Sequence, residues 1–152
     1  MNNGLPIVYN LKTASVTDIS LHLTACNHSF IPPLSSRINL EEYAQKIHDK
    51  AITFEAWQDK TLIGLIAAYF SSNEQKMAFI TNVSVYSNYM GAGIASKLLS
   101  MTIHYASQHH YSAINLEVNC NNTAAINFYK KNHFFQTETK EKSIFLTYQI
   151  NQ

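Results

Sequence analysis

The stretch Phe79-Ile-Thr-Asn-Val-Ser-Val-Tyr-Ser-Asn-Tyr-Met-Gly-Ala-Gly-Ile-Ala-Ser-Lys-Leu-Leu99 decides the fold of this chain. It begins with β-branched and aromatic residues, which favour a strand, and then passes through a turn of small residues. Apolar residues follow at helical spacing, at Ile94, Leu98, Met101 and Tyr105. The pattern predicts a strand, a tight turn and a helix.

The turn from Gly91 to Ala95 has the chemistry of an anion site. A helix begins with free N–H groups at the positive end of its dipole, and glycine lets a ligand approach the main chain. The dinucleotide fingerprint G-x-G-x-x-G is excluded because Ser96 stands at its third glycine, and the chain has no G-x-x-x-x-G-K-[ST] loop. The turn is therefore either a phosphate cradle of another type or an ordinary helix start.

Two motifs at the expected distance resemble one known family. Val83-Ser-Val-Tyr-Ser-Asn-Tyr-Met-Gly-Ala-Gly-Ile-Ala95 is similar to the acyl-coenzyme A loop of the GNAT N-acetyltransferase superfamily, V-x-P-x-Y-[RQ]-G-x-G-I-[GA]. Leu116-Glu-Val-Asn-Cys-Asn-Asn-Thr-Ala-Ala-Ile-Asn-Phe-Tyr-Lys-Lys-Asn-His-Phe134 is similar to that family's L-x-V-x-x-x-N-x-x-A-x-x-x-Y-x-x-x-G-F. The order of the elements outside the motifs also fits the family.

Three positions depart from the family pattern. Met90 stands where Arg or Gln is usual, which removes a polar side chain near the pyrophosphate and leaves that contact to backbone N–H groups. His133 replaces a glycine, and Ser87 replaces a proline. These departures bear on the affinity for the cofactor more than on the fold.

The resemblance implies an α/β (α+β) fold in one domain over residues 1–152. This fold is a three-layer sandwich, with a mixed, mostly antiparallel sheet of about seven strands flanked by four helices. In it the fourth and fifth strands splay apart and admit the pantetheine arm. From the residue pattern, strands are expected at 7–11, 52–57, 61–70, 77–85, 113–119, 134–136 and 143–150, and helices at 17–29, 40–48, 94–107 and 122–132.

Bulk properties limit the class of protein. The 152 residues are 46% hydrophobic, which fits one domain with a sizeable core. A formal charge of +1 argues against a nucleic acid or an anionic membrane surface as partner. Neither an export signal nor a membrane span is visible, so we expect a cytoplasmic protein in which Cys26 and Cys120 are free thiols.

The resemblance implies acetyl-coenzyme A as co-substrate and assigns residues to hold it. Backbone N–H groups of Val83 and Val85 would pair with the pantetheine and polarise the thioester carbonyl. Asn122 matches the second motif and would touch the coenzyme, cap a helix, or do both. The predicted phosphate cradle comprises Met90, Gly91, Ala92, Gly93, Ile94 and Ala95.

Catalysis by direct transfer needs an acid and a base. Tyr129 matches the family's tyrosine and is expected to protonate the departing thiolate, the alternative being an aromatic core residue. Glu117 is the preferred base, with Glu55 and a water molecule held by Asn82 as alternatives. A covalent route through Cys120 is disfavoured because nothing near it in the sequence supplies an activating base.

The segment Phe30-Ile-Pro-Pro-Leu-Ser-Ser-Arg37 is the candidate acceptor site, since in GNAT-like proteins the connection between the first two helices borders the acceptor pocket. Ser36 and Arg37 could bind a substrate carboxylate or phosphate. The alternative is a solvated surface arginine after a proline turn. No metal site is expected, because His104 and His110 lack the i, i+4 spacing of a helical site.

The sequence therefore predicts an acetyl-coenzyme A-dependent N-acetyltransferase that acts on an amine of a small molecule. Three alternatives remain open: a non-catalytic acyl-coenzyme A-binding or sensing module, an acetyltransferase for peptide or protein amines, and a nucleotide-binding regulatory domain that owes the loop to phosphate alone. Edge strands near the C-terminus could also pair across a homodimer.

Overall fold

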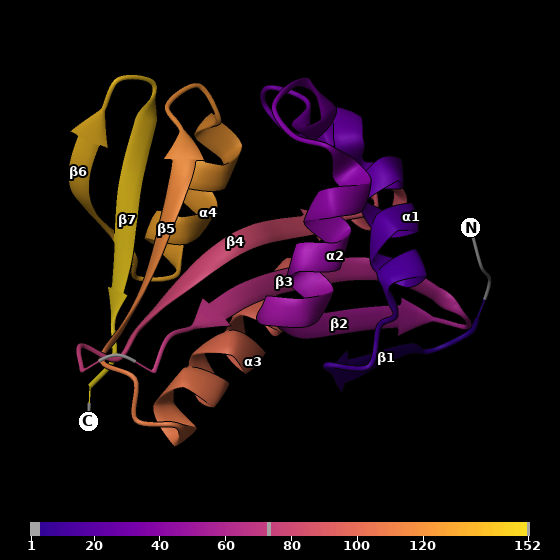
Figure 1. The fold of residues 1–152 in the computed structure, drawn as a ribbon, viewed down its shortest axis with the longest axis horizontal. Helices are drawn as coiled ribbons and strands as arrows, with labels where there is room; N and C mark the ends of the chain where they lie inside the picture. The colour runs from indigo at the N-terminus through magenta and orange to yellow at the C-terminus, as the bar shows by residue number, and fades with distance from the viewer. Residues whose placement is uncertain (1–3, 73, 152) are drawn as a thin grey trace. The chain divides into compact units, whose positions relative to one another are not determined.

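The structure is a computed structural model that describes residues 4–72 and 74–151. Over these residues it contains seven strands and four α-helices, which Figure 1 shows in chain order. The elements are β1 (Ile7–Leu11), α1 (Val16–Cys26), η1 (Asn27–Ser29), η2 (Leu34–Ser36), α2 (Leu40–Lys50), β2 (Ile52–Gln58), β3 (Thr61–Phe70), β4 (Met77–Val85), η3 (Ser87–Tyr89), α3 (Ile94–Gln108), β5 (Ala113–Asn119), α4 (Thr123–Lys131), β6 (Phe135–Lys140) and β7 (Ser143–Gln149).

The strands form one mixed sheet in the order β1-β2-β3-β4-β5-β7-β6. β1 with β2, β2 with β3, β5 with β7 and β6 with β7 are antiparallel pairs. β4 and β5 are parallel, with Met77–Ile80 beside Ala113–Leu116. This mixed sheet with its helices confirms the predicted fold class, whereas the splaying of β4 from β5 stays a prediction.

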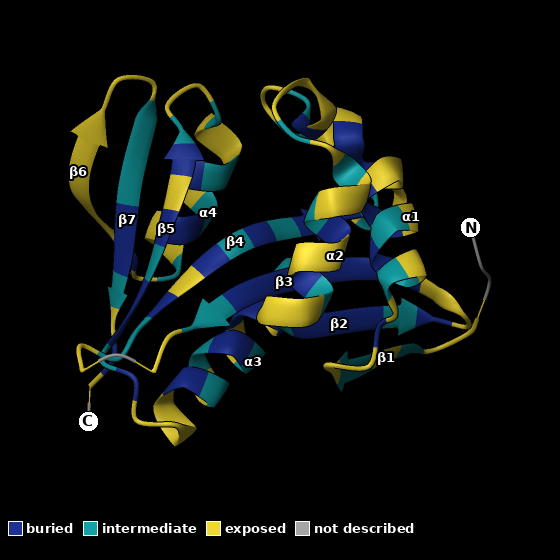
Figure 2. Cartoon of the chain, in the orientation of Figure 1, coloured by how far each residue is buried: buried dark blue, intermediate teal, exposed yellow. Residues whose placement is uncertain are grey.

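The chain divides into two compact units, of which the first comprises Met1–Ala68 and Asn82–Thr102. Its core lies around β2 and β3, and β3 is buried from Leu62 to Ala68, as its almost continuous apolar run predicts (Figure 2). The prediction of a single domain stays a prediction.

The caps of the first two helices show how local polar residues set helix starts. The Asn39 side chain accepts a hydrogen bond from the Glu42 N–H at 3.0 Å and caps α2. α1 begins at Val16, one residue before the predicted 17, because Ser15 is the N-cap and Asp18 is the third residue of its capping box.

The second unit comprises Tyr69–Thr81 and Ile103–Gln152. β6 is longer than the predicted 134–136 and runs to Lys140. All six of its residues are exposed, so no apolar alternation marks the strand in the sequence, and pairing with β7 defines it instead. Pairing of such an edge across a homodimer stays a prediction.

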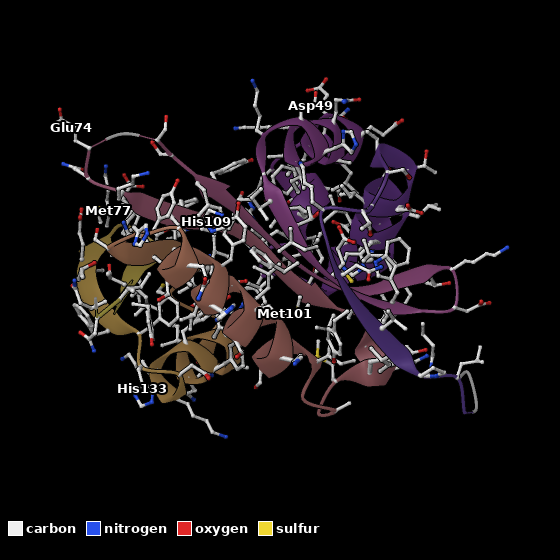
Figure 3. All side chains as sticks on the ribbon, turned by 90° about the horizontal axis from the view of Figure 1, so that it is seen from below. Asp49, Glu74, Met77, Met101, His109 and His133 are labelled. Carbon is white, nitrogen blue, oxygen red and sulfur yellow. The ribbon has the colours of Figure 1, made fainter. Side chains whose placement is uncertain are left out.

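His133, labelled in Figure 3, lies beyond the end of α4 with φ +73°, where the family motif has glycine. A histidine in this left-handed conformation is strained because its Cβ crowds the backbone. The neighbouring Asn132 has an ordinary φ of −96°.

We therefore expect His133→Gly to stabilise the protein by about 1 kcal/mol. Urea denaturation measures the change. Asn132→Gly is the matched control and should lower stability, since glycine there gains no conformational relief. A midpoint for His133→Gly at or below that of the wild type would contradict the strain argument.

No helix in the described residues is both long enough and apolar enough to cross a bilayer.

Candidate functional site

The predicted phosphate cradle lies between η3 and α3. Gly91 and Gly93 have φ of +82° and +80°, a conformation that strains residues with side chains. A Cβ atom built on either glycine meets no heavy atom within 4 Å apart from its chain neighbours. The glycines thus give the loop its conformation and leave the space beside the main chain open.

Backbone donors gather where α3 begins. The Lys97 N–H donates to the Gly93 carbonyl at 3.0 Å, which is the first hydrogen bond of the helix. Within the described part of the chain, the N–H groups of Gly93, Ile94, Ala95 and Ser96 have no acceptor. Free donors at a helix N-terminus bind phosphate groups, so the residues present fit the diphosphate of coenzyme A.

Tyr89 links the start of the loop by hydrogen bonds to residues of the first unit that are distant in the sequence. Its hydroxyl donates a hydrogen bond to the side-chain oxygen of Gln58, and Gln58 Nε2 donates to the Leu5 carbonyl at 2.9 Å. The Tyr86 N–H donates to the Ile63 carbonyl at 2.8 Å. Our sequence reasoning missed Gln58, since 31 residues separate it from Tyr89.

Met90 is 60% exposed beside the cradle. Its thioether has no N–H or O–H to donate, whereas the family's Arg or Gln would donate to a phosphate. Any hydrogen bonding of the loop to a diphosphate therefore falls to the backbone N–H groups of Gly93–Ser96.

Gly64 allows α3 to pack closely on β3, and our sequence reasoning missed this residue as well. A Cβ atom at Gly64 would lie 2.9 Å from Ile94 Cγ2, 3.2 Å from Ala56 Cβ and 3.2 Å from Leu98 Cδ1. Ile94 is the first residue of α3, so Gly64 sets how near the cradle helix comes to the sheet.

Gly64→Ala is expected to lower the free energy of unfolding by about 1–3 kcal/mol, because the added methyl group overpacks this contact. Chemical denaturation measures the loss. Ile94→Leu removes the clashing Cγ2, so the double variant should lose less than the sum of the single changes. Simple additivity would show that the Ile94 contact is not the cause.

Val83 and Val85 lie at the end of β4, where Val85 is buried and Val83 half-buried. Residues two apart on a strand present their N–H groups on the same edge, the arrangement that a partner in extended conformation needs. The side chains of Asn82 and Ser84 lie on the opposite face from Val83, and both are buried.

The candidate acceptor segment is held by Asn27, which is buried. Its side-chain oxygen accepts from the Ser35 N–H at 2.7 Å, and its amide nitrogen donates to Ser35 Oγ at 2.8 Å. Ser36 Oγ donates to the Pro33 carbonyl at 2.6 Å. Arg37 is exposed, and no carboxylate in the described residues pairs with it, so its guanidinium is available to a ligand.

Tyr129 lies in the second unit, on α4, and is only 7% exposed. Its ring packs near Phe128 and Phe134, with centroid distances of 5.4 and 5.6 Å. The hydroxyl forms no hydrogen bond with any described residue, and burial raises the pKa of the phenol above its ordinary value. At neutral pH the phenol therefore keeps its proton and has it free to donate.

Asn122 is the N-cap of α4, and its side-chain oxygen accepts from the Ala125 N–H at 3.2 Å. The amide nitrogen of Asn122 is not part of this cap. Contact of Asn122 with the coenzyme stays a prediction.

The two glutamates considered as bases have different surroundings. Glu117 is exposed on β5 and accepts a hydrogen bond from Ser143 Oγ at 2.6 Å. Glu55 is fully buried on β2 and has its carboxylate oxygens committed to protein donors. These donors are the Thr13 N–H and Oγ1, the Ala14 N–H, Thr53 Oγ1 and Trp57 Nε1. Glu55 thus joins the β1–α1 connection to β2, and Glu117 keeps the base assignment as a prediction.

The thiols and histidines offer little nucleophilic or metal chemistry. Burial raises the pKa of the Cys26 thiol to about 11, so it stays protonated. Cys120 is exposed, and its sulfur lies 3.9 Å from Asn121 Oδ1, which cannot act as a base. His109, labelled in Figure 3, stacks on Tyr105 at 4.0 Å. Among the described residues, no three metal-ligating side chains come together.

Comparison with known proteins connects this geometry to relatives. The model of the acetyltransferase (GNAT) family matches residues 19–134. Streptothricin acetyltransferase A of Bacillus subtilis (strain 168) is 33% identical over 63 residues, which is 41% of this chain and 36% of that protein. The chain thus matches little more than a third of the length of this curated relative.

Solved structures share the fold at low sequence identity. The ribosomal-protein-S18-alanine N-acetyltransferase of Escherichia coli superposes with a TM-score of 0.76 at 16% identity, covering 95% of this chain and 96% of that one. The PaiA N-acetyltransferase of Thermoplasma acidophilum, in complex with coenzyme A, gives a TM-score of 0.75 at 17% identity, covering 93% and 99%.

Proposed function

The chain belongs to the acetyltransferase (GNAT) family, and on this premise we propose that it transfers the acetyl group of acetyl-coenzyme A to an amine of a small-molecule acceptor by direct attack. The observation that carries the proposal is the loop from Gly91 to Ser96. It combines two glycines in left-handed conformation, open space beside them and uncommitted N–H groups at the start of α3. These features suit the diphosphate of the co-substrate.

In the proposed reaction the predicted site residues have separate tasks. The Val83 and Val85 N–H groups hold the pantetheine and polarise the thioester carbonyl, and the amine nitrogen attacks the carbonyl carbon. The C–S bond breaks with its electron pair on sulfur, which takes the proton of Tyr129, while the amine gives up its proton to Glu117. Asn122 contacts the coenzyme, and Arg37 with Ser36 orients an anionic group of the acceptor. The proposed setting is the cytoplasm.

Calorimetric titration with acetyl-coenzyme A tests the cradle, with ATP and NAD as controls. Selective binding of acetyl-coenzyme A supports the proposal, and a panel of amines assayed by thiol release then identifies the acceptor class. Binding of ATP or NAD without coenzyme A would instead indicate a nucleotide-binding domain.

A second candidate function is an acyl-coenzyme A-binding or sensing module. Met90 favours it, because an exposed apolar side chain stands where the family places a phosphate ligand. This candidate predicts cofactor binding without thioester consumption for every amine. The E. coli protein with the same fold acts on an alanine of a ribosomal protein, so peptide and protein amines belong in the same panel.

A further inference from the structure

His22, on α1, is fully buried and makes contacts with two strands of the first unit. Its Nδ1 lies 2.8 Å from the Leu62 carbonyl oxygen on β3, and its Nε2 lies 2.9 Å from Ser84 Oγ on β4. Its ring stacks on Tyr86, with centroids 5.4 Å apart and 13° between the ring planes.

The partners of His22 fix the positions of its protons. A carbonyl oxygen only accepts, so Nδ1 carries the hydrogen and donates to Leu62. In the neutral ring Nε2 is then an acceptor, and it faces the Ser84 hydroxyl. The Ser84 hydroxyl also donates to Asn82 Oδ1 at 2.7 Å. A hydroxyl has one proton, so Nε2 and Asn82 Oδ1 share it as acceptors, and both hold Ser84 Oγ in place.

Burial also keeps the His22 ring in its neutral form. It lowers the pKa of His22 to about 4. The neighbouring titratable groups are the Cys26 thiol, 3.7 Å from Nε2, and the Tyr86 phenol, and neither is charged at neutral pH. A base this weak takes little part in removing a proton from an amine near pH 7. The ring instead holds one tautomer and one set of partners throughout the physiological range.

We infer that His22, through Ser84, is a positioning residue that fixes the end of β4 for the thioester. Ser84 lies between Val83 and Val85, whose N–H groups hold the pantetheine in the proposed function on which this inference rests. Tyr86, on which the ring stacks, is the residue from which η3 and the cradle begin. The hydrogen bond from Nδ1 to the Leu62 carbonyl orients the ring on β3, and the contact of Nε2 with Ser84 Oγ sets the distance of β4 from α1.

Four variants test the positioning role: His22→Leu and Ser84→Ala remove the link, His22→Gln restores a donor and an acceptor, and Thr102→Val is the control. Thr102 is buried on α3, and within the described residues its hydroxyl bonds only to the Leu98 carbonyl of its own helix. Each variant is assayed well below its melting temperature for acetyl-coenzyme A affinity by calorimetry and for thiol release with the best amine of the panel.

We expect His22→Leu and Ser84→Ala to lower the rate of transfer by roughly 10- to 100-fold, because a small displacement of reacting groups is costly. The dissociation constant for acetyl-coenzyme A should change less than about threefold, because the cradle that binds the diphosphate is intact. His22→Gln should recover most of the rate. Thr102→Val should lose stability without losing rate.

Amide NMR spectra give a readout that does not need the acceptor. In the wild type, the Val83 and Val85 amide signals should shift on addition of acetyl-coenzyme A, and in Ser84→Ala these shifts should shrink or change direction.

Two results separate the inference from the proposed function. Suppose that the wild type binds acetyl-coenzyme A and transfers acetyl groups. If His22→Leu and Ser84→Ala then have the same transfer rate as Thr102→Val, and Ser84→Ala shows the same amide shifts as the wild type, the inference is overturned and the function stands. If the wild type fails to bind acetyl-coenzyme A at all, the proposed function fails. Should His22→Leu not fold, Ser84→Ala decides alone, because it leaves the hydrogen bond from His22 to Leu62 in place.

Discussion

Tyr129→Phe should lower the turnover of acetyl transfer by roughly 100-fold or more, the size typical of losing a general acid, with the affinity for acetyl-coenzyme A nearly unchanged. The physical reason is that the Tyr129 phenol is protonated and its hydroxyl is free to donate. Its hydroxyl is uncommitted within the described residues, and burial raises its pKa, so at neutral pH it keeps the proton that the departing sulfur would take. Steady-state thiol release and calorimetry measure the two quantities.

Tyr148→Phe is the matched control, since it makes the same change in the same unit. Its ring lies 5.5 Å from Phe134, the residue that also packs near Tyr129. We expect this control to keep wild-type turnover. Equal rates for Tyr129→Phe and Tyr148→Phe would remove Tyr129 from the mechanism and leave it as a core aromatic.

Gly93→Val should abolish acetyl-coenzyme A binding in calorimetric titrations. At φ +80° a β-branched residue is forced out of its allowed conformations, and its side chain would enter the open space through which a phosphate approaches the free N–H groups. Both effects act on the same few atoms, so we expect the affinity to fall below detection.

Gly4→Val separates strain from blockage. Gly4 has φ +88° and equally open surroundings, so the substitution imposes comparable backbone strain at a position with no part in the cradle. We expect it to keep wild-type affinity. Retained binding in Gly93→Val would refute the assignment of the loop.

The elements and motifs could largely be predicted because they depend on neighbouring residues. The apolar spacing from Ile94 to Tyr105 identifies α3, and Asn39 with Glu42 identifies the start of α2, since one turn of helix brings those residues together. The glycines of the cradle are recognisable from the motif, and their left-handed conformations explain why glycine is needed there. An edge strand such as β6 has no buried face, so its sequence carried no such signal.

The candidate site could be predicted only in part, because a side chain's role depends on partners that folding brings from far along the chain. Glu55 was a reasonable base in the sequence, but Thr13, Ala14 and other donors occupy its carboxylate in the fold. His22 carried no signal, because Ser84 is 62 residues away.

By itself, the sequence determined the family, the order of elements and the glycine loop before α3, because short-range spacing and backbone conformation define them. Only the tertiary structure decided which polar groups are committed and which are free: His22 and Glu55 are fully engaged, whereas the Tyr129 hydroxyl and the N–H groups from Gly93 to Ser96 have no acceptor within the described chain. The physical reason is that burial makes hydrogen bonding obligatory, and the partners that satisfy it are chosen by packing between distant segments.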